Sequence, residues 1–161
     1  VHGGFGTSLR FYGVDFSIGF TYQLGGQVLD QGYMFYMDSP AGTSTGNNYH
    51  HDLLNSWTPE NSGSNIPRFA YNDSNQAAVS DRFLTSASYL NIQNITLGYT
   101  LPKRITRKFL VENLRIYFAC DNVWYWSKRP GLDPRQAING ITNPYYYAPI
   151  RTFSGGVTVT F

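Results

Sequence analysis

The residues best suited to metal chemistry are three neighbours, His50, His51 and Asp52. Imidazole and carboxylate groups are common zinc ligands. Adjacent residues of a helix, however, point about 100° apart around its axis, so two consecutive helical histidines do not readily face one ion. We therefore interpret the three residues as part of a solvated loop, and we predict no metal site and no cofactor.

Four of the twelve basic residues gather in LPKRITRKF, at Lys103, Arg104, Arg107 and Lys108. Such a cluster suits either a nucleic-acid backbone or a solvated turn beside anionic lipid headgroups. The net charge is only +2, which gives no sign of a polyanionic partner. We favour the turn and expect no nucleic acid as a partner.

Motifs that would indicate catalysis are missing. The sequence contains no GxSxG, no HExxH, no phosphate-binding glycine loop and no carboxylate pair at a useful spacing. The single cysteine, Cys120, excludes an internal disulfide and falls on the apolar side of its segment. We predict that the protein is not an enzyme.

Aromatic residues remain as candidates for recognition, because they make up 17% of the chain and include thirteen tyrosines. Trp57, Tyr145, Tyr146 and Tyr147 lie in polar or proline-containing stretches. Flat rings there can stack on sugars or contact a partner. Packing within the loop is the plainer interpretation, and we keep these four as candidate loop contacts to partner or substrate.

The elements that must position these residues are strands. From Tyr12 to Gln23 the even positions are all aromatic or aliphatic, and the odd positions are small or polar. Such strict alternation gives a strand with one apolar face. Between Tyr12 and Tyr22 the strand covers ~25 Å of the bilayer normal at a tilt of ~40°. This matches a lipid-facing barrel strand whose two tyrosines belong to aromatic girdles.

Four further segments are predicted as strands. The last, residues 152–161, alternates with Phe153, Val157, Val159 and Phe161 on one face. Residues 88–101 and 112–126 also alternate, but they lose phase near Gln93-Asn94 and near Asn122, which suggests β-bulges. Residues 27–37 form a weaker fifth strand. Trp124 and Trp126 are expected in the outer aromatic girdle.

The four connections alternate between short and long. In chain order they are a tight turn at 24–26, a long connection at 38–87, a short connection at 102–113 and a long connection at 127–147. Barrels show this pattern with short periplasmic turns and long extracellular loops. Phe161 would then lie at the periplasmic rim. Within the first long loop we predict a short helix that begins at Asn47 or Asn48, carries Tyr49, Leu53 and Trp57 on one side, and ends at Thr58-Pro59.

Six segments in this order resemble the carboxyl-terminal end of the SusC/RagA family of TonB-dependent outer-membrane transporters. They are YGVDFSIGFTYQLGGQVLD, NSWTPENSGSNIPRF, SYLNIQNITLGYTLP, NLRIYFACDNVWYWSK, GLDPR and YYYAPIRTFSGGVTVTF. The resemblance implies a 22-stranded barrel around an amino-terminal plug, usually capped by a SusD-like lipoprotein. It also implies import of glycans or peptides in the bacterial outer membrane, with energy delivered through TonB.

Nothing in residues 1–161 resembles a plug, a TonB box or a signal peptide. We therefore expect these residues to be the carboxyl-terminal portion of a receptor barrel, about five strands in contact with outer-membrane lipid. The segment GGVTVTF, with Val157, Val159 and Phe161, resembles the terminal signal by which outer-membrane barrels are recognised for assembly. The first and last strands of residues 1–161 are expected to pair with strands elsewhere in the protein.

Polar residues on the opposite face of the strands, such as Asp15, Gln23, Arg115 and Asp121, are expected to line the barrel lumen or contact the plug. Two other classes of protein share the alternation. A soluble β-sandwich carbohydrate-binding module would need a second apolar sheet or a covering helix. A small adhesin-type or porin-type barrel would need about eight strands.

Overall fold

The computed structural model describes residues 1–40, 46–137, 139–143 and 145–161. The chain divides into two compact units. Unit 1 comprises Val1–Gly26, Ala87–Gly131 and Tyr147–Phe161, and unit 2 comprises Gln27–Ser86 and Leu132–Tyr146. Among the described residues, no helix has both the length and the apolar character needed to cross a membrane.

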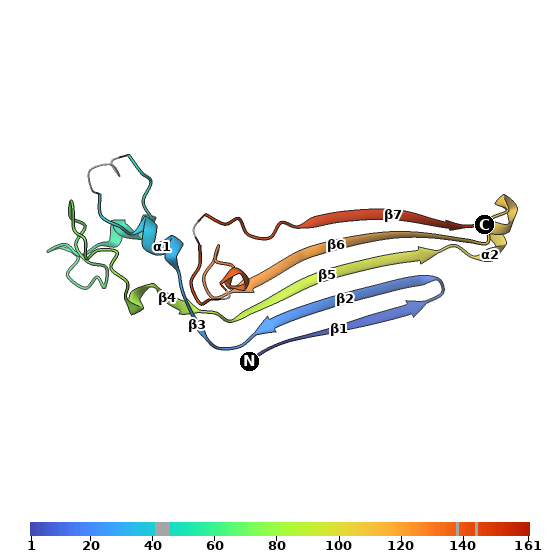
Figure 1. The fold of residues 1–161 in the computed structure, drawn as a ribbon, viewed down its shortest axis with the longest axis horizontal. Helices are drawn as coiled ribbons and strands as arrows, with labels where there is room; N and C mark the ends of the chain where they lie inside the picture. The colour runs from blue at the N-terminus through green and yellow to red at the C-terminus, as the bar shows by residue number, and fades with distance from the viewer. Residues whose placement is uncertain (41–45, 138, 144) are drawn as a thin grey trace. The chain divides into compact units, whose positions relative to one another are not determined.

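Unit 1 is a five-stranded antiparallel sheet (Figure 1). Its strands are β1 (His2–Phe11), β2 (Val14–Gln23), β5 (Tyr89–Thr100), β6 (Asn113–Ser127) and β7 (Thr152–Thr160). Their order in the sheet is β1-β2-β5-β6-β7, so each strand lies beside the next strand of this sheet along the chain. Two short helices, α2 (Lys103–Thr106) and η4 (Arg107–Phe109), connect β5 to β6. The prediction of an antiparallel, mainly β fold is confirmed. The sheet is not closed within these residues, and the strand number of a whole barrel remains a prediction.

One predicted strand is wrong and one real strand was missed. Residues 27–37 form the three-residue β3 (Gln27–Leu29) and then α1 (Gln31–Tyr36). The helix begins there because the Asp30 side chain accepts a hydrogen bond from the Tyr33 N–H at 2.9 Å, an N-cap contact. Strand β1 escaped prediction because glycines, which are rare in strands, interrupt its alternation.

Strands β1 and β2 are joined by a two-residue turn, Tyr12-Gly13. Both residues have positive φ, 46° and 86°, as a type I′ turn requires. A Cβ atom on Gly13 would lie 2.6 Å from the carbonyl oxygen of Thr100, so the position also needs glycine for space. The tight hairpin predicted at residues 24–26 is therefore wrong, because these residues lead from β2 to β3.

The short connections of the sheet are residues 12–13 and 101–112, and the long ones are 24–88 and 128–151. The predicted alternation of short and long connections is thus kept with different boundaries. Thr160 of β7 pairs with Asn113 of β6. The last strand therefore ends on the side of the short connections.

The predicted phase breaks are register shifts of the sheet. Gln93 is an extra residue of β5 relative to β2, because the partner of Gly19 is Asn94 and the partner of Phe20 is Ile92. In β6 the corresponding step runs from Asp121 to Trp124 and contains Asn122, whose φ is +50°. Relative to β2, strand β5 holds one extra residue and β6 holds two, and the apolar residues of both strands stay on the same face on either side of the bulges.

The register separates the two faces of the sheet, because directly opposite residues of an antiparallel sheet share a face. One face carries the large apolar residues of all five strands. Its middle row contains Ile18, Ile95, Cys120 and Phe153, with Thr7 of β1 at the end of the row. Many of these side chains are exposed, including Leu9, Phe118 and Val157. The described residues of unit 1 form no second sheet over this face, unlike a β-sandwich.

Unit 2 has a small core of its own, formed by Val28, Met37 and Phe83. Strand β3 pairs with β4 (Leu84–Ser86), which follows η3 (Asp81–Phe83). Among the described residues of this unit, the other helices are η2 (His51–Asn55) and η5 (Pro134–Gln136). The helix predicted in the first long loop corresponds to η2, which is a shorter 3-10 helix.

That helix is capped by His50 rather than by Asn47 or Asn48. It ends at Asn55 and is followed by the C-cap Ser56, whose backbone is no longer helical (φ −56°, ψ 154°), so Tyr49 and Trp57 lie outside the helix. The predicted helical stripe of Tyr49, Leu53 and Trp57 is therefore wrong.

Candidate functional site

An ion pair joins strands β2 and β6 on the polar face of unit 1. Arg115 of β6 donates from Nε to Asp15 Oδ1 at 3.0 Å and from Nη2 to Asp15 Oδ2 at 2.5 Å. Between them in the sheet lies Gly98 of β5, opposite Asp15 on one side and Tyr117 on the other. A Cβ on Gly98 would come within 2.5 Å of the carboxylate. The absence of a side chain at Gly98 therefore lets the pair form across a whole strand.

A cavity of about 490 Å³ lies beside this pair on the polar face. Its polar lining residues are Ser8, Arg10, Asp15, Ser17, Thr96 and Arg115. Arg10 is directly opposite Asp15 in the β1–β2 hairpin. Two guanidinium groups and one carboxylate can bind polar or acidic groups, but the lining contains no nucleophile held by a general base. The lining therefore suits the binding of polar or acidic groups.

The four polar residues predicted for this face do not form one site. The structure brings Asp15 and Arg115 together, as described. Gln23 lies at the opposite end of β2, where its Nε2 contacts the Gly25 carbonyl at 3.5 Å. Asp121 pairs with Thr152 of the edge strand β7.

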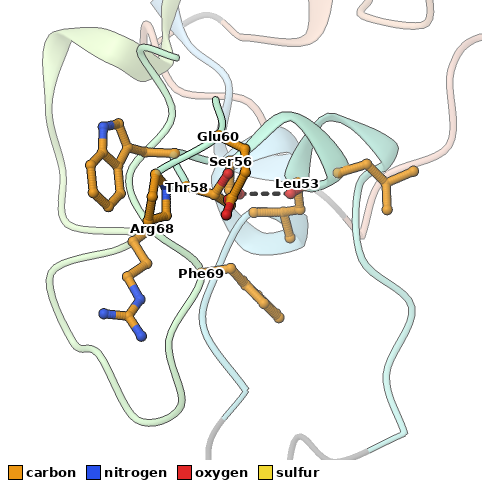
Figure 2. Close-up of a pocket in the computed structure, with 9 residues that line it drawn as sticks. Leu53, Ser56, Thr58, Glu60, Arg68 and Phe69 are labelled. Atoms are coloured by element: carbon orange, nitrogen blue, oxygen red, sulfur yellow. Dashed lines mark hydrogen bonds between the residues drawn. The ribbon is translucent and has the colours of Figure 1, made fainter. Parts of the chain in front are cut away.

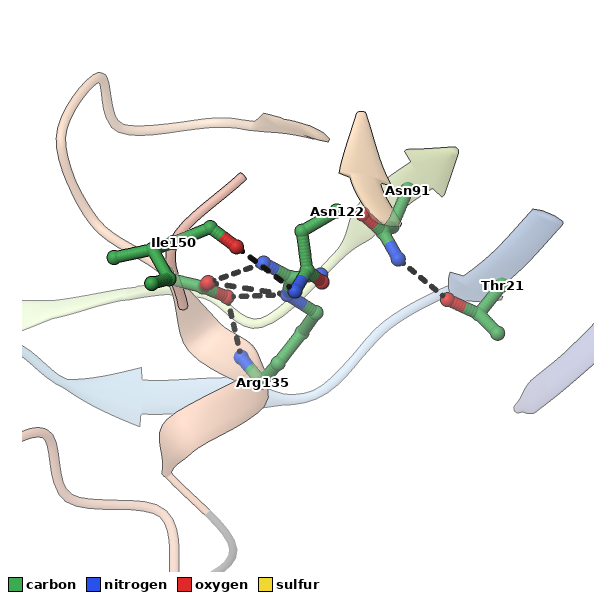
Figure 3. A network of polar contacts seen from close by, with 6 residues as sticks. Thr21, Asn91, Asn122, Arg135 and Ile150 are labelled. Atoms are coloured by element: carbon green, nitrogen blue, oxygen red, sulfur yellow. Dashed lines mark hydrogen bonds and ion pairs between the residues drawn. The ribbon is translucent and has the colours of Figure 1, made fainter. Parts of the chain in front are cut away.

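Two asparagine amides strengthen the long-connection end of the sheet (Figure 3). Asn91, which is buried, donates to Thr21 Oγ1 at 3.1 Å and so ties β5 to β2. Asn122 donates to the Ile150 carbonyl at 3.2 Å. Asn122 lies in the bulge of β6. Its hydrogen bond therefore links the bulge to the segment that leads into β7.

The GLDPR segment is held by its own charges. In unit 2 the Asp133 carboxylate accepts the backbone N–H of Arg135 at 3.1 Å and so caps η5. The guanidinium of Arg135 (Figure 3) binds the same carboxylate from Nε at 2.8 Å and from Nη2 at 2.6 Å. These contacts explain the local conformation of the segment and leave Asp133 buried.

The candidate girdle residues occupy two ends of the apolar face. Tyr22 and Trp126 both lie opposite Leu90, and Trp124 lies in the next row, opposite Ile92. Tyr12 is at the other end, in the turn, with its ring 4.3 Å from that of Phe11. Sequence reasoning missed that Phe11 and Tyr99 share this end, although both follow the alternation. The girdle role of Tyr12, Tyr22, Trp124 and Trp126 stays a prediction.

The proposed assembly residues lie along the free edge of the sheet. Val157 and Val159 of β7 are opposite Ile116 and Leu114, so both are on the apolar face. Phe161 follows the strand and is exposed. This placement is what a strand-borne signal would need, and the assembly role itself stays a prediction.

The four loop aromatics fall into different surroundings. Trp57 lines a cavity of about 690 Å³ in unit 2 together with Glu60, Arg68 and Phe69 (Figure 2). The Ser56 hydroxyl beside it donates to the Leu53 carbonyl at 2.6 Å. Phe69, which sequence reasoning did not single out, also contacts the Tyr49 ring at 5.5 Å.

Tyr145 packs edge-on against Phe35 at 6.4 Å within unit 2, so packing inside the loop accounts for part of its surface. Tyr146 and Tyr147 are exposed to 68% and 94%. They present more surface to a partner than Trp57 does.

His50, His51 and Asp52 lie close together. His51 Nε2 is 2.9 Å from Asp52 Oδ1, and His50 Nδ1 is 3.3 Å from Asp52 Oδ2. The helical argument against a shared ion fails because His50 precedes the helix, with an extended backbone (φ −69°, ψ 139°). Its ring therefore lies 4.5 Å from that of His51 instead of pointing away.

No family model matches the chain, but individual proteins do. TonB-dependent receptor P3 of Formosa agariphila is 26% identical over 168 aligned positions that cover 98% of the chain. TonB-dependent receptor SusC of Bacteroides thetaiotaomicron is 30% identical over 128 positions that cover 71% of it. The chain is a homologue of TonB-dependent receptors.

Solved structures agree with this relationship at the level of the fold. The RagAB peptide importer in its closed-closed state superposes with a TM-score of 0.81 at 22% identity and covers 99% of the chain. The RagAB peptide transporter gives a TM-score of 0.80 at 24% identity. The predicted resemblance to SusC and RagA is thereby confirmed. TonB-dependent receptors are outer-membrane transport proteins and not enzymes, as predicted.

The chain is short beside these TonB-dependent receptors. It spans 16% of the length of receptor P3, 13% of SusC and 17% of the RagAB chain. Its similarity therefore concerns one part of such a receptor.

Proposed function

We propose that residues 1–161 are the carboxyl-terminal part of the barrel of a TonB-dependent transporter. The transporter imports glycans or peptides through the bacterial outer membrane together with a SusD-like lipoprotein. The observation that carries this proposal is the register of the five strands, which puts large apolar side chains on one face and small or polar ones on the other. The apolar face contacts lipid, and the polar face contacts the lumen or the plug.

The remaining parts of the transporter lie outside these residues. The relatives are much longer than the part that this chain matches. A plug and a TonB-binding segment would be supplied by the corresponding further portion of this protein. The cavity beside Asp15 and Arg115 would then receive polar side chains of the plug. In this arrangement the long connections 24–88 and 128–151 face the cell exterior and meet the lipoprotein.

Uptake by the complete protein tests the transport function. A strain that lacks the gene should lose uptake of labelled oligosaccharides or peptides, and a strain that lacks TonB should lose the same uptake. Return of the gene should restore it. Uptake of every labelled oligosaccharide and peptide at the normal rate in the gene-deleted strain would contradict the proposal.

Co-purification tests the partner. The tagged transporter, extracted from outer membranes, should retain a surface lipoprotein. Replacing both Tyr146 and Tyr147, which are exposed, by alanine should reduce the retained lipoprotein. Phe109→Ala is the control, because this aromatic residue is also exposed and lies in the short connection 101–112, away from the connections proposed to meet the lipoprotein. Equal loss in the control would remove the specific role of Tyr146 and Tyr147.

A further inference from the structure

Two imidazoles and a carboxylate converge at the start of η2 in unit 2. His50, His51 and Asp52 each offer one ligand atom, and these atoms all lie within 4.8 Å of one another. We propose that these residues bind one divalent transition-metal ion of the zinc type. This inference is independent of the transport function, because it depends only on residues within unit 2.

The separations suit such an ion. A tetrahedral zinc site with bonds of about 2.0 to 2.1 Å holds its ligand atoms about 3.3 Å apart. His50 Nδ1 is 3.3 Å from one oxygen of Asp52, and His51 Nε2 is 2.9 Å from the other. The three ligand atoms all lie within 4.8 Å of one another, so side-chain rotations would have to shorten the longest separation for all three to bind one ion.

The hydrogen bonds leave two acceptor atoms, His50 Nδ1 and Asp52 Oδ2, close to one another. The Asp52 N–H donates to His50 Nδ1 at 3.2 Å, so Nδ1 carries a lone pair rather than a proton. The same nitrogen is 3.3 Å from the carboxylate oxygen Oδ2. Two acceptor atoms at this distance repel one another, and a cation bound by both removes the repulsion. The ion would take the Nδ1 lone pair in place of the Asp52 N–H.

Tyr33 of α1 orients the ligands from behind. Its hydroxyl donates to Asp52 Oδ2 at 2.9 Å, and its ring meets the His50 ring edge-on at 4.8 Å. Hydrogen bonds of this kind from outside the ligand set fix the orientation of ligating groups and raise metal affinity. Tyr33 is therefore a positioning residue of the site.

Exposure leaves a route for the ion. The side chains of His50 and Asp52 are about two-thirds buried, at 32% and 30% exposure, whereas His51 is 79% exposed. The open side leaves coordination positions for water. Two nitrogen donors and one carboxylate favour zinc, copper or nickel over calcium and magnesium, which prefer oxygen ligands.

Metal titration of the complete protein tests the site. The protein is purified without a histidine tag, stripped with a chelator and titrated with Zn²⁺, with Co²⁺ as a spectroscopic probe. Wild type should bind one equivalent more than His51→Ala and Asp52→Asn. Tyr33→Phe should keep the equivalent with about tenfold weaker affinity.

His2→Ala is the matched control, because His2 is the remaining histidine of the chain and lies in β1. It should bind as wild type does. His51→Ala changes an exposed side chain, so the variant should remain folded, which the heat-dependent gel mobility of the barrel checks. Equal zinc content in wild type and His51→Ala would overturn the proposal, and so would equally tight binding of Ca²⁺.

Discussion

Two glycines of unit 1 occupy positions where a larger side chain would not fit. Gly13 combines a positive φ of 86° with a backbone oxygen, that of Thr100, 2.6 Å from where a Cβ would stand. Gly98 leaves room for the ion pair of Asp15 and Arg115, which joins strands on either side of β5. In both cases a methyl group would compete with a contact that holds neighbouring strands together.

Gly13→Ala should destabilise the barrel by about 1–3 kcal/mol, because alanine would be strained at this φ and would press on the backbone of β5. The measurement is the urea midpoint of the folded form of the complete protein in detergent. Gly155→Ala is the control, since its nearest Cβ contact is an ordinary 3.5 Å. A Gly13→Ala midpoint no lower than that of Gly155→Ala would refute the steric argument.

At the scale of an element, neighbouring residues of one strand face different environments. Phe118 of β6 is opposite Leu97 and stacks on Phe153 at 6.0 Å, on the apolar face. Ala119, the next residue, is opposite Thr96 on the polar face. The proposed barrel puts lipid on the first face and the lumen on the second, so one strand supplies both halves of an experiment.

Phe118→Arg should cost about 2–4 kcal/mol if the residue lies near the bilayer midplane, because a cation is poorly solvated there. Ala119→Arg should have a much smaller effect. Folding yield into lipid vesicles and the urea midpoint both report the difference. Equal losses for the two variants would argue against a lipid-facing surface.

The edge strand β7 carries the proposed assembly residues. Phe161→Ala should lower the amount of protein inserted in the outer membrane while leaving its synthesis unchanged, since the aromatic end of the signal is lost. Phe161→Tyr keeps the ring and should insert normally. Surface labelling and the total amount of protein together give the inserted fraction. An inserted fraction equal to that of wild type for Phe161→Ala would remove this role.

At the scale of the whole molecule, unit 1 has two edge strands and an exposed apolar face. Among the strands that the structure describes, β1 pairs only with β2, and β7 pairs only with β6. Unpaired backbone groups are costly in a membrane and promote aggregation in water. Both edges therefore call for partners, which a complete barrel would supply.

The isolated 161-residue chain should aggregate in detergent-free buffer, whereas the complete protein should be folded in detergent. Light scattering and size-exclusion chromatography make the comparison. A soluble monomer that melts cooperatively would speak for a self-contained module, such as a carbohydrate-binding domain, and against a barrel segment.

Local pattern was sufficient for much of this protein. The alternation from Tyr12 to Gln23, the phase breaks at Gln93 and Asn122, and the apolar face of residues 152–161 are properties of neighbouring residues, so they could be predicted from the sequence. The same reasoning missed β1, where glycines weaken the pattern. It also took residues 27–37 for a strand, because it did not weigh the helix cap at Asp30.

Tertiary structure decided which residues meet. Asp15 and Arg115 are 100 residues apart and pair only because the register of three strands, with a glycine between, brings them together. His50, His51 and Asp52 are adjacent in sequence, yet only the extended backbone of His50 and the hydroxyl of Tyr33 turn them toward one point. Side-chain alternation is set by the local backbone, whereas convergence depends on strand register and on packing between distant segments.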